Sequence, residues 1–229
     1  MPDHTPTPDT GGDYNPRDYP AVAVTVDIVM FTIVDAELKV LLIQRGTPPF
    51  LGQWALPGGF IHPDEDLADA ARRELAEETG IHQDPGHLEQ FGSYGDPDRD
   101  PRMRVVTVGF WAIVSDLPTP AGGSDARNAE LVAVSEVESG RIRLAFDHAT
   151  ILADALETAR SKLESTTLAA AFCGPEFTVS DLRKVYDAVW NTELDAGNFQ
   201  RKVTKSKGFI EPVEMPPARH GDKGGRPAS

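Results

Sequence analysis

The most constraining feature of the sequence is a run of glutamates that one helix would place on a single face. Apolar periodicity predicts a helix over residues 67–79. On a helix that advances about 100° per residue, Glu74, Glu77 and Glu78 fall inside an arc of roughly 100°. Three like charges so placed destabilise an isolated helix by tenths of a kcal/mol per pair, which a bound cation can offset. For three glutamates alone, a solvated acidic face is the commoner alternative.

The loop before this helix adds to the case for a cation. The Pro57–Gly59 segment lacks bulky side chains, so its backbone can approach a metal ion or a phosphate group. Mg²⁺ prefers one or two carboxylates, keeps several waters and takes phosphate oxygens as further ligands. Arg73 lies four residues before Glu77 and can pair with it, or reach back to Glu65. The segment is therefore a candidate site for Mg²⁺ and a phosphate-bearing ligand.

The spacing of the whole segment resembles the Nudix box at every specified position. A glycine is followed after five residues by a glutamate, and after seven more by Arg-Glu-Leu-x-Glu-Glu-x-Gly-Ile. The matching positions are Gly59, Glu65, Arg73, Glu74, Leu75, Glu77, Glu78, Gly80 and Ile81. The resemblance implies an α/β fold, the Nudix α/β/α sandwich, and a metal site for cleaving a nucleoside diphosphate linked to another moiety.

Carried over by position, the resemblance implies a role for each polar residue of the box. Glu74, Glu77 and Glu78 would hold Mg²⁺ or Mn²⁺, with the Gly59 carbonyl as an added ligand. Glu74 would also activate the attacking water, and Arg73 would brace the loop against the helix. A metal held there neutralises the diphosphate, polarises phosphorus and lowers the pKa of bound water.

Strand patterns around the box indicate a mixed α/β domain over residues 21–145. Asp66 is a plausible N-cap of the carboxylate helix, and Gly80 suits a left-handed C-terminal cap. Residues 1–20, rich in proline and small polar residues, are expected to form a flexible arm. Strands are predicted over residues 21–34, 38–45, 87–94, 104–114 and 131–137.

Past Arg143 the strand signal stops, and three helices are predicted within a second domain over residues 146–229. Asp147 can cap the first helix, and Thr178 with Asp181 forms a capping-box pair at the start of the second. The third helix, from about 195 to 206, has a polar-basic arc of roughly 100° beside an apolar stripe. The arc consists of Asn198, Arg201, Lys202 and Lys205, and the stripe of Phe199 and Val203.

Charge is distributed unevenly along the chain. The net charge of −14 argues against indiscriminate binding of nucleic acid by the whole surface. Residues 195–229, however, hold seven basic residues against four acidic ones, a net +3, which leaves −17 for residues 1–194. This distribution suggests that the basic C-terminal part binds a polyanion. An ordinary solvated basic tail is an equally good interpretation. A helix-turn-helix would place the third helix in the major groove, where Asn and Arg read base edges.

The pair of domains resembles the Nudix-related transcriptional regulators, the NrtR family, in which a winged helix follows a Nudix domain. The resembling segments are VDIVMFTI, PPFLGQWALPGGF, YGDPDRDPRMRVVTVGFWAIV, LAFDHATIL, FTVSDLRKVYDAVW, LDAGNFQRKV and GGRPAS. The resemblance implies a repressor of NAD-biosynthesis genes, a homodimer on a palindromic operator in double-stranded DNA, that responds to ADP-ribose or a related NAD metabolite. The DNA contacts would come from Asn198, Arg201, Lys202, Lys205 and Lys207, and from Arg226 in the wing.

Two departures from the family pattern matter. Many such regulators have degraded Nudix boxes, whereas this box is intact, which leaves open a Nudix hydrolase that cleaves ADP-ribose to AMP and ribose 5-phosphate. The recognition region has Ala196-Gly197 where more basic residues are usual, so operator preference can differ.

Weaker signals concern the nucleotide ligand. Pro97, sixteen residues after Ile81, resembles the downstream proline of ADP-ribose pyrophosphatases, although such a proline is often only a turn. The candidates to grip a diphosphate are Arg45, Arg99 and Arg102, and those to stack on adenine are Phe50, Trp54 and Tyr94. For the arginines, ordinary surface charge is at least an equally good interpretation. For the aromatic residues, the same holds of an ordinary position in the core.

Other features exclude several protein classes. Cys173 is the single cysteine, which rules out an intramolecular disulfide. The chain has no run of about 18 apolar residues and no basic, then apolar, leader, so we expect neither a membrane span nor a secretory signal. A cytoplasmic protein without membrane partners is the resulting expectation.

Overall fold

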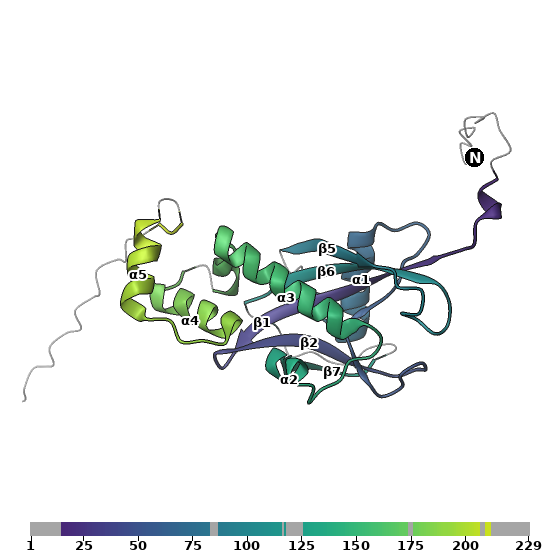
Figure 1. Ribbon diagram of the computed structural model, residues 1–229, viewed down its shortest axis with the longest axis horizontal. Helices are drawn as coiled ribbons and strands as arrows, with labels where there is room; N and C mark the ends of the chain where they lie inside the picture. The colour runs from purple at the N-terminus through teal and green to yellow at the C-terminus, as the bar shows by residue number, and fades with distance from the viewer. Residues whose placement is uncertain are drawn as a thin grey trace, which may run out of the picture.

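A mixed β-sheet built on one long strand, β1, forms the centre of the structure (Figure 1). The computed structural model describes residues 15–82, 87–115, 117, 126–173, 176–206 and 209–211. The strands are β1 (Ala23–Val34), β2 (Glu37–Arg45), β3 (Trp54–Ala55), β4 (Gly58–Phe60), β5 (Leu88–Tyr94), β6 (Val105–Ile113) and β7 (Ala126–Ala133). The helices are η1 (Pro16–Asp18), α1 (Leu67–Thr79), α2 (Val134–Glu138), α3 (His148–Ser165), η2 (Leu168–Phe172), α4 (Val179–Trp190) and α5 (Ala196–Lys205).

The sheet runs in the order β3-β2-β1-β6-β5, with β4 paired to β1 and β7 paired to β2. The β1–β6 pair is parallel, whereas β1 is antiparallel to both β2 and β4. The Asp27↔Gly58 pairing places Asp27 of β1 beside the glycine loop that precedes the carboxylate helix, and on its other side Asp27 pairs with Gly109 of β6. This register brings the N-terminal half of β1 to the predicted ligand site.

The two faces of β1 are covered by different helices, because successive strand residues point to opposite sides. Val26 and Ile28 pack with residues of α1, whereas Val29 and Phe31 belong to a cluster with the apolar face of α3. Buried residues of α4 and α5 join that second cluster, so the core continues from the sheet into the C-terminal helices. Figure 1 shows α3 lying along the sheet and reaching toward α4. The sequence-based boundary near residue 145 stays a prediction.

Several predicted elements have the expected bounds. Helix α1 spans Leu67–Thr79, and Gly80 at its C-terminus adopts a left-handed φ of 70°. Thr178 and Asp181 form the predicted capping box of α4, and Asp195 caps α5 by accepting a hydrogen bond from the Asn198 backbone.

Two predicted N-cap residues lie at the expected positions but form no capping hydrogen bond. They are Asp66 at the start of α1 and Asp147 at the start of α3. The carboxylate of Asp147 binds Arg99 instead. A charged partner displaces the cap here because a charge-assisted bond is the stronger one.

The strand predicted over residues 131–137 is wrong beyond Ala133. Strand β7 covers Ala126–Ala133, and the chain then turns into helix α2. The partner strand explains the early end: Ala133 pairs with Lys39, only two residues from the start of β2 at Glu37. Val134 and Val137 are an i, i+3 pair on α2.

The predicted flexible arm and wing fall largely outside the described residues. Of residues 1–20, the structure describes only 15–20, where η1 lies away from the rest of the described chain (Figure 1). Of the predicted wing, it describes only residues 209–211. Within the described segments, no helix combines the length and apolar character that crossing a membrane requires.

Candidate functional site

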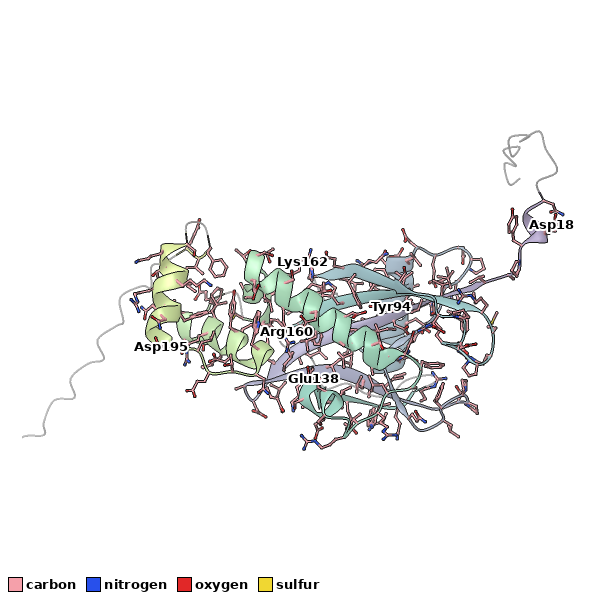
Figure 2. All side chains as sticks on the ribbon, viewed as in Figure 1. Asp18, Tyr94, Glu138, Arg160, Lys162 and Asp195 are labelled. Atoms are coloured by element: carbon pink, nitrogen blue, oxygen red, sulfur yellow. The ribbon has the colours of Figure 1, made fainter. Side chains whose placement is uncertain are left out.

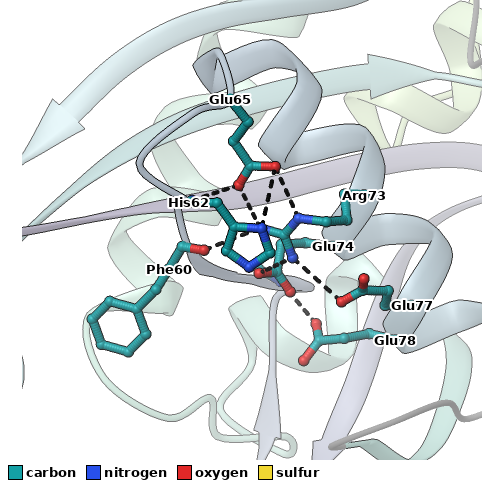
Figure 3. A network of polar contacts seen from close by, with 8 residues as sticks. Phe60, His62, Glu65, Arg73, Glu74, Glu77 and Glu78 are labelled. Atoms are coloured by element: carbon teal, nitrogen blue, oxygen red, sulfur yellow. Dashed lines mark hydrogen bonds and ion pairs between the residues drawn. The ribbon is translucent and has the colours of Figure 1, made fainter. Parts of the chain in front are cut away.

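Arg73 of α1 joins the carboxylates of the box to the preceding loop (Figure 3). Its guanidinium donates to both carboxylate oxygens of Glu65, at 2.9 and 2.6 Å, and to the Phe60 carbonyl at 3.0 Å. It also donates to Glu74 at 2.8 Å and to Glu77 at 3.3 Å. The hydrogen bond from Arg73 lowers the pKa of Glu65 to about 2. The loop is therefore tied to the helix by one cation.

Within the carboxylate arc, Glu78 is buried and Glu74 is partly buried. The Glu74 carboxylate lies directly against the Cα of Gly59, so a larger residue at position 59 would force this carboxylate to move. Glu78 accepts a hydrogen bond from the Gly58 N–H at 2.9 Å. Burial raises the pKa of both side chains, that of Glu78 to about 8. The Glu77 side chain is half exposed.

The donor set of this corner fits a hard divalent cation in its chemistry. It consists of carboxylate and backbone carbonyl oxygens, which such cations prefer as ligands. The raised pKa values of Glu74 and Glu78 show that burial disfavours their charged forms, which a nearby cation would stabilise. Across the part of the chain that the structure describes, however, no three His, Cys, Asp or Glu side chains are gathered as metal ligands. Arg73 engages Glu74 and Glu77 instead.

Two of the three predicted diphosphate-binding arginines meet at Phe146, which sequence reasoning did not select. The Arg45 guanidinium lies 4.8 Å from the centroid of the Phe146 ring, and that of Arg102 lies 5.9 Å from it. Phe50 contacts the same ring edge-on, at 4.7 Å between centroids. Phe146 has a left-handed φ of 54°, rare for a residue with a bulky side chain. Backbone outliers of this kind cluster at functional sites.

Arg99, the third predicted arginine, is buried and binds two carboxylates of the protein. Its guanidinium binds both carboxylate oxygens of Asp147, at 2.9 and 2.7 Å, and Asp27 at 3.2 Å. The side chain is only 4% exposed. Burial by itself would lower the pKa of Arg99, but the hydrogen bond to Asp147 and the charge of Asp27 outweigh it and raise the pKa. Its donors are therefore directed at protein carboxylates.

His148, the first residue of α3, joins this network to the glycine loop. Its Nδ1 accepts a hydrogen bond from the Leu56 N–H at 2.9 Å, and its Nε2 lies 3.5 Å from Asp27 Oδ1. Burial lowers the pKa of the His148 imidazole. The ring is therefore neutral at physiological pH, with its proton on Nε2 facing Asp27.

A cleft of about 630 Å³ opens beside Phe146, within the size range of small-molecule sites. It is lined by Phe50, Ser93, Tyr94, Gly95, Asp96, Asp98, Arg99, Phe146, Asp147 and Thr150. Of the predicted adenine-stacking residues, Phe50 and Tyr94 line this cleft. Trp54 packs against the main hydrophobic cluster instead and does not line it.

The residues that sequence reasoning missed are Asp27, Phe146 and His148. Asp27 lies inside an apolar strand run, and nothing local marks Phe146 as left-handed. The available signal was the segment LAFDHATIL, which belongs to the family resemblance and contains Phe146, Asp147 and His148 in succession.

Helix α5 presents its predicted polar-basic arc to solvent. Asn198, Arg201, Lys202 and Lys205 are all exposed, whereas Phe199 and Val203 are buried in the core. Arg201 donates a hydrogen bond to the Asn198 side chain. The other predicted DNA contacts, Lys207 and Arg226, lie outside the described residues.

Profiles of known families match both parts of the chain. Residues 24–155 match the NUDIX domain. Residues 169–229 match the NrtR DNA-binding winged helix domain.

Two curated relatives are similar to the chain. The ADPR responsive transcriptional repressor NtrR of Acinetobacter baylyi is 33% identical over 204 residues, covering 88% of this chain and 80% of the relative. The ADP-ribose pyrophosphatase of Methanocaldococcus jannaschii is 39% identical over 136 residues, covering 59% of this chain and 73% of the relative.

Two solved structures of one protein are similar in fold. Shewanella oneidensis NrtR complexed with a 27mer DNA is 32% identical, with a TM-score of 0.65 and coverage of 80% of this chain and 82% of that one. The NUDIX domain of the same protein complexed with ADP ribose is 37% identical, with a TM-score of 0.57 and coverage of 64% and 94%.

Proposed function

The chain belongs to the Nudix-related transcriptional regulators of the NrtR family, and we propose that it represses NAD-biosynthesis genes in response to ADP-ribose or a related NAD metabolite. The observation that carries the proposal is the union, in one chain, of a Nudix fold with a winged-helix region whose exposed helix is basic. The Acinetobacter baylyi relative, similar over 88% of the chain, is by its name an ADPR responsive transcriptional repressor, which supports the proposal. Because an operator is chromosomal, we expect the protein in the cytoplasm.

Helix α5 is the proposed recognition helix. With Phe199 and Val203 docked in the core, Asn198 and Arg201 face solvent, where they can reach adenine and guanine edges in a major groove. Lys202 and the residues beyond it would neutralise phosphates. We assign Lys205, Lys207 and Arg226 to this second group. A homodimer would bind two half-sites about one helical turn apart on a palindromic operator.

The cleft beside Phe146 is the proposed nucleotide site. Arg45 and Arg102 flank the Phe146 ring, so their charge can meet a diphosphate at the edge of the cleft. Asp96 and Asp98 line the cleft and can accept hydrogen bonds from ribose hydroxyls. Arg99 would act indirectly, by holding Asp147.

The carboxylate corner is the proposed site of a divalent cation, Mg²⁺ or Mn²⁺. Glu74, Glu77, Glu78 and the Gly59 carbonyl would be its ligands, as the box spacing implies. The chemistry of the donors supports this, since carboxylates and backbone carbonyls are the ligands such cations take. A bound cation would neutralise diphosphate charge and lower the pKa of a bound water.

A DNA-shift assay with the full-length protein tests the main proposal. The probe is a duplex selected by the protein from a randomised pool, titrated with and without ADP-ribose. We expect a sequence-specific complex whose affinity changes with ADP-ribose. Log affinity should also fall with log salt concentration by about 0.9 per phosphate neutralised. Selection of no sequence above background at modest salt would contradict the proposal.

A second candidate function is hydrolysis of ADP-ribose to AMP and ribose 5-phosphate. The intact box favours it, as does the similarity to the Methanocaldococcus jannaschii ADP-ribose pyrophosphatase. The test is release of AMP from ADP-ribose with Mg²⁺, with Glu77→Gln as the matched control that removes one charge. Product release that persists unchanged in Glu77→Gln would argue for a contaminating enzyme. No release by the unmodified protein would leave the site a binding role only.

A further inference from the structure

Helix α3 spans the distance between the proposed nucleotide cleft and the proposed DNA-binding helices (Figure 2). Its 18 residues extend about 27 Å at 1.5 Å per residue. The N-terminal end lies at the cleft, where Asp147 and Thr150 are lining residues. The C-terminal half contacts α4. A rigid element with one end at each site can carry a displacement from one to the other.

The cleft end of α3 is held by contacts that a nucleotide would compete for. Phe146, directly before the helix, keeps its left-handed backbone while its ring packs against Arg45, Arg102 and Phe50. Such a conformation at a bulky residue persists only where surrounding contacts determine it. A diphosphate that attracts either guanidinium therefore weakens the contacts that hold Phe146.

The next two residues bind the start of α3 to the sheet and to the glycine loop. Asp147 is clamped by Arg99, which also binds Asp27 of β1. His148 accepts a hydrogen bond from the N–H of Leu56, which lies in the segment that leads into the Gly58–Phe60 strand. The position of the first turn of α3 is thus linked to both the cleft and the loop of the Nudix box.

The far end of α3 is joined to α4 by two sets of hydrogen bonds. Arg160 donates through Nε and Nη2 to the Val189 carbonyl, at 3.3 and 3.2 Å. Tyr186 of α4 donates its hydroxyl to the Leu163 carbonyl at 2.9 Å. The ring of Tyr186 also contacts Phe199 of α5, at 5.2 Å between centroids. These contacts connect α3, through α4, to the helix that presents the basic arc.

We infer that α3 is the coupling element of this protein, with Phe146 sensing the nucleotide and His148 and Tyr186 acting as positioning residues at its two ends. The inference rests on the proposed function, because it assigns a route between the two sites proposed there. Close-packed interiors transmit small shifts without absorbing them, so displacement of the first turn moves the α4 contacts. Nucleotide occupancy and DNA affinity should then depend on each other.

The first test compares two full-length variants that each remove one hydroxyl. Tyr186→Phe deletes the α4–α3 hydrogen bond and keeps the aromatic ring, whereas Thr158→Val deletes an internal α3 bond to Asp154. Operator affinity is measured by titration with and without saturating ADP-ribose, and ADP-ribose affinity is measured alone by calorimetry. In the unmodified protein we expect ADP-ribose to change operator affinity by about 5- to 150-fold, expressed as the ratio of the affinities with and without ADP-ribose. In Tyr186→Phe this ratio should fall toward one while ADP-ribose affinity alone is unchanged, and Thr158→Val should keep the full ratio.

The second test uses the cleft end of the helix. In His148→Asn the carboxamide oxygen can accept the Leu56 N–H in place of Nδ1, whereas His148→Leu removes the acceptor. We expect the ratio to be largely retained in His148→Asn and lost in His148→Leu. Calorimetric binding of ADP-ribose by both variants verifies that they fold. The reciprocal effect of DNA on ADP-ribose affinity should change by the same factor.

The outcomes separate this inference from the function on which it rests. If ADP-ribose does not alter operator affinity in the unmodified protein, both are overturned. If it does, and if Tyr186→Phe and His148→Leu keep the full ratio as Thr158→Val does, the proposed function stands and the route through α3 is overturned. Loss of the ratio in Tyr186→Phe and His148→Leu, with retention in the two controls, supports the inference.

Discussion

Several charged side chains of the acidic N-terminal region are partly or fully buried and paired with one another, whereas those of the basic helix α5 are exposed to solvent. Around Arg73 and Arg99, carboxylates and guanidinium groups are partly or fully buried and bind one another. On α5, Arg201 and Lys202 face solvent, and only the apolar stripe is buried. Charge in the first region therefore contributes to stability and shapes a site, whereas charge on α5 is available to a partner. Substitutions in the two regions should consequently affect different measurements.

The largest expected effect follows from replacing the most buried arginine. Arg99→Met leaves the carboxylates of Asp27 and Asp147 unpaired near the core, so we expect a loss of about 3–5 kcal/mol in the free energy of unfolding. Urea denaturation measures it. The control is Arg72→Met, because the side chains of Arg72 and Asp69 are 46% and 71% exposed, so their ion pair should be worth less than about 1 kcal/mol. Equal losses in the two variants would show that burial does not distinguish them.

A charge on α5 should affect binding and leave stability alone. Arg201→Ala removes an exposed guanidinium, so operator binding should weaken by about 1–3 kcal/mol, or roughly 5- to 150-fold. The free energy of unfolding should stay within about 0.5 kcal/mol of the unmodified value. Exposed Gln200 on the same helix supplies the control Gln200→Ala. A large change in stability, or an unchanged operator affinity, would contradict the contrast between the regions.

The raised pKa of Glu78 predicts that stability depends on pH in the acidic region. Burial raises its pKa from 4.5 to about 8, so the folded state holds a proton that the unfolded state releases above pH 4.5. The stabilisation is complete below pH 4.5 and is lost as the pH rises through 8. Without metal at pH 8, Glu78→Gln should therefore be more stable than the unmodified protein, by more than about 1 kcal/mol.

Thermal unfolding from pH 5 to pH 8.5 checks this prediction, with Glu77→Gln as the control, since the Glu77 side chain is half exposed. A pH dependence that is the same in both variants would mean that Glu78 titrates as an ordinary surface glutamate.

The smallest expected effect concerns a cap that the sequence suggested and the structure does not form. Asp66 makes no side-chain capping hydrogen bond, whereas Thr178 caps α4 in a complete capping box. Asp66→Ala should therefore cost less than about 0.5 kcal/mol, and Thr178→Ala about 1 kcal/mol. Chemical denaturation of the two variants side by side measures the difference. A greater loss from Asp66→Ala would indicate a cap that forms in solution.

Local patterns predicted the elements well because their causes are local. The bounds of α1, the left-handed Gly80 and the capping box at Thr178 follow from periodicity and backbone preferences within a few residues. The strand predicted over residues 131–137 failed because its end depends on the length of β2, which is remote in sequence. Asp147 lies at the N-cap position but makes no capping hydrogen bond, because its carboxylate binds Arg99, 48 residues away.

The sequence by itself determined the two charged helix faces, since helical periodicity and residue type suffice to place Glu74 with Glu78, and Arg201 with Asn198. Only the tertiary structure decided what each charge does. Packing against the loop buries Glu78 and raises its pKa, while docking of Phe199 turns Arg201 outward. The roles of Arg99, Phe146 and His148 likewise arise from contacts between distant segments. Burial and pairing depend on neighbours that folding supplies, and these cannot be read from spacing along one element.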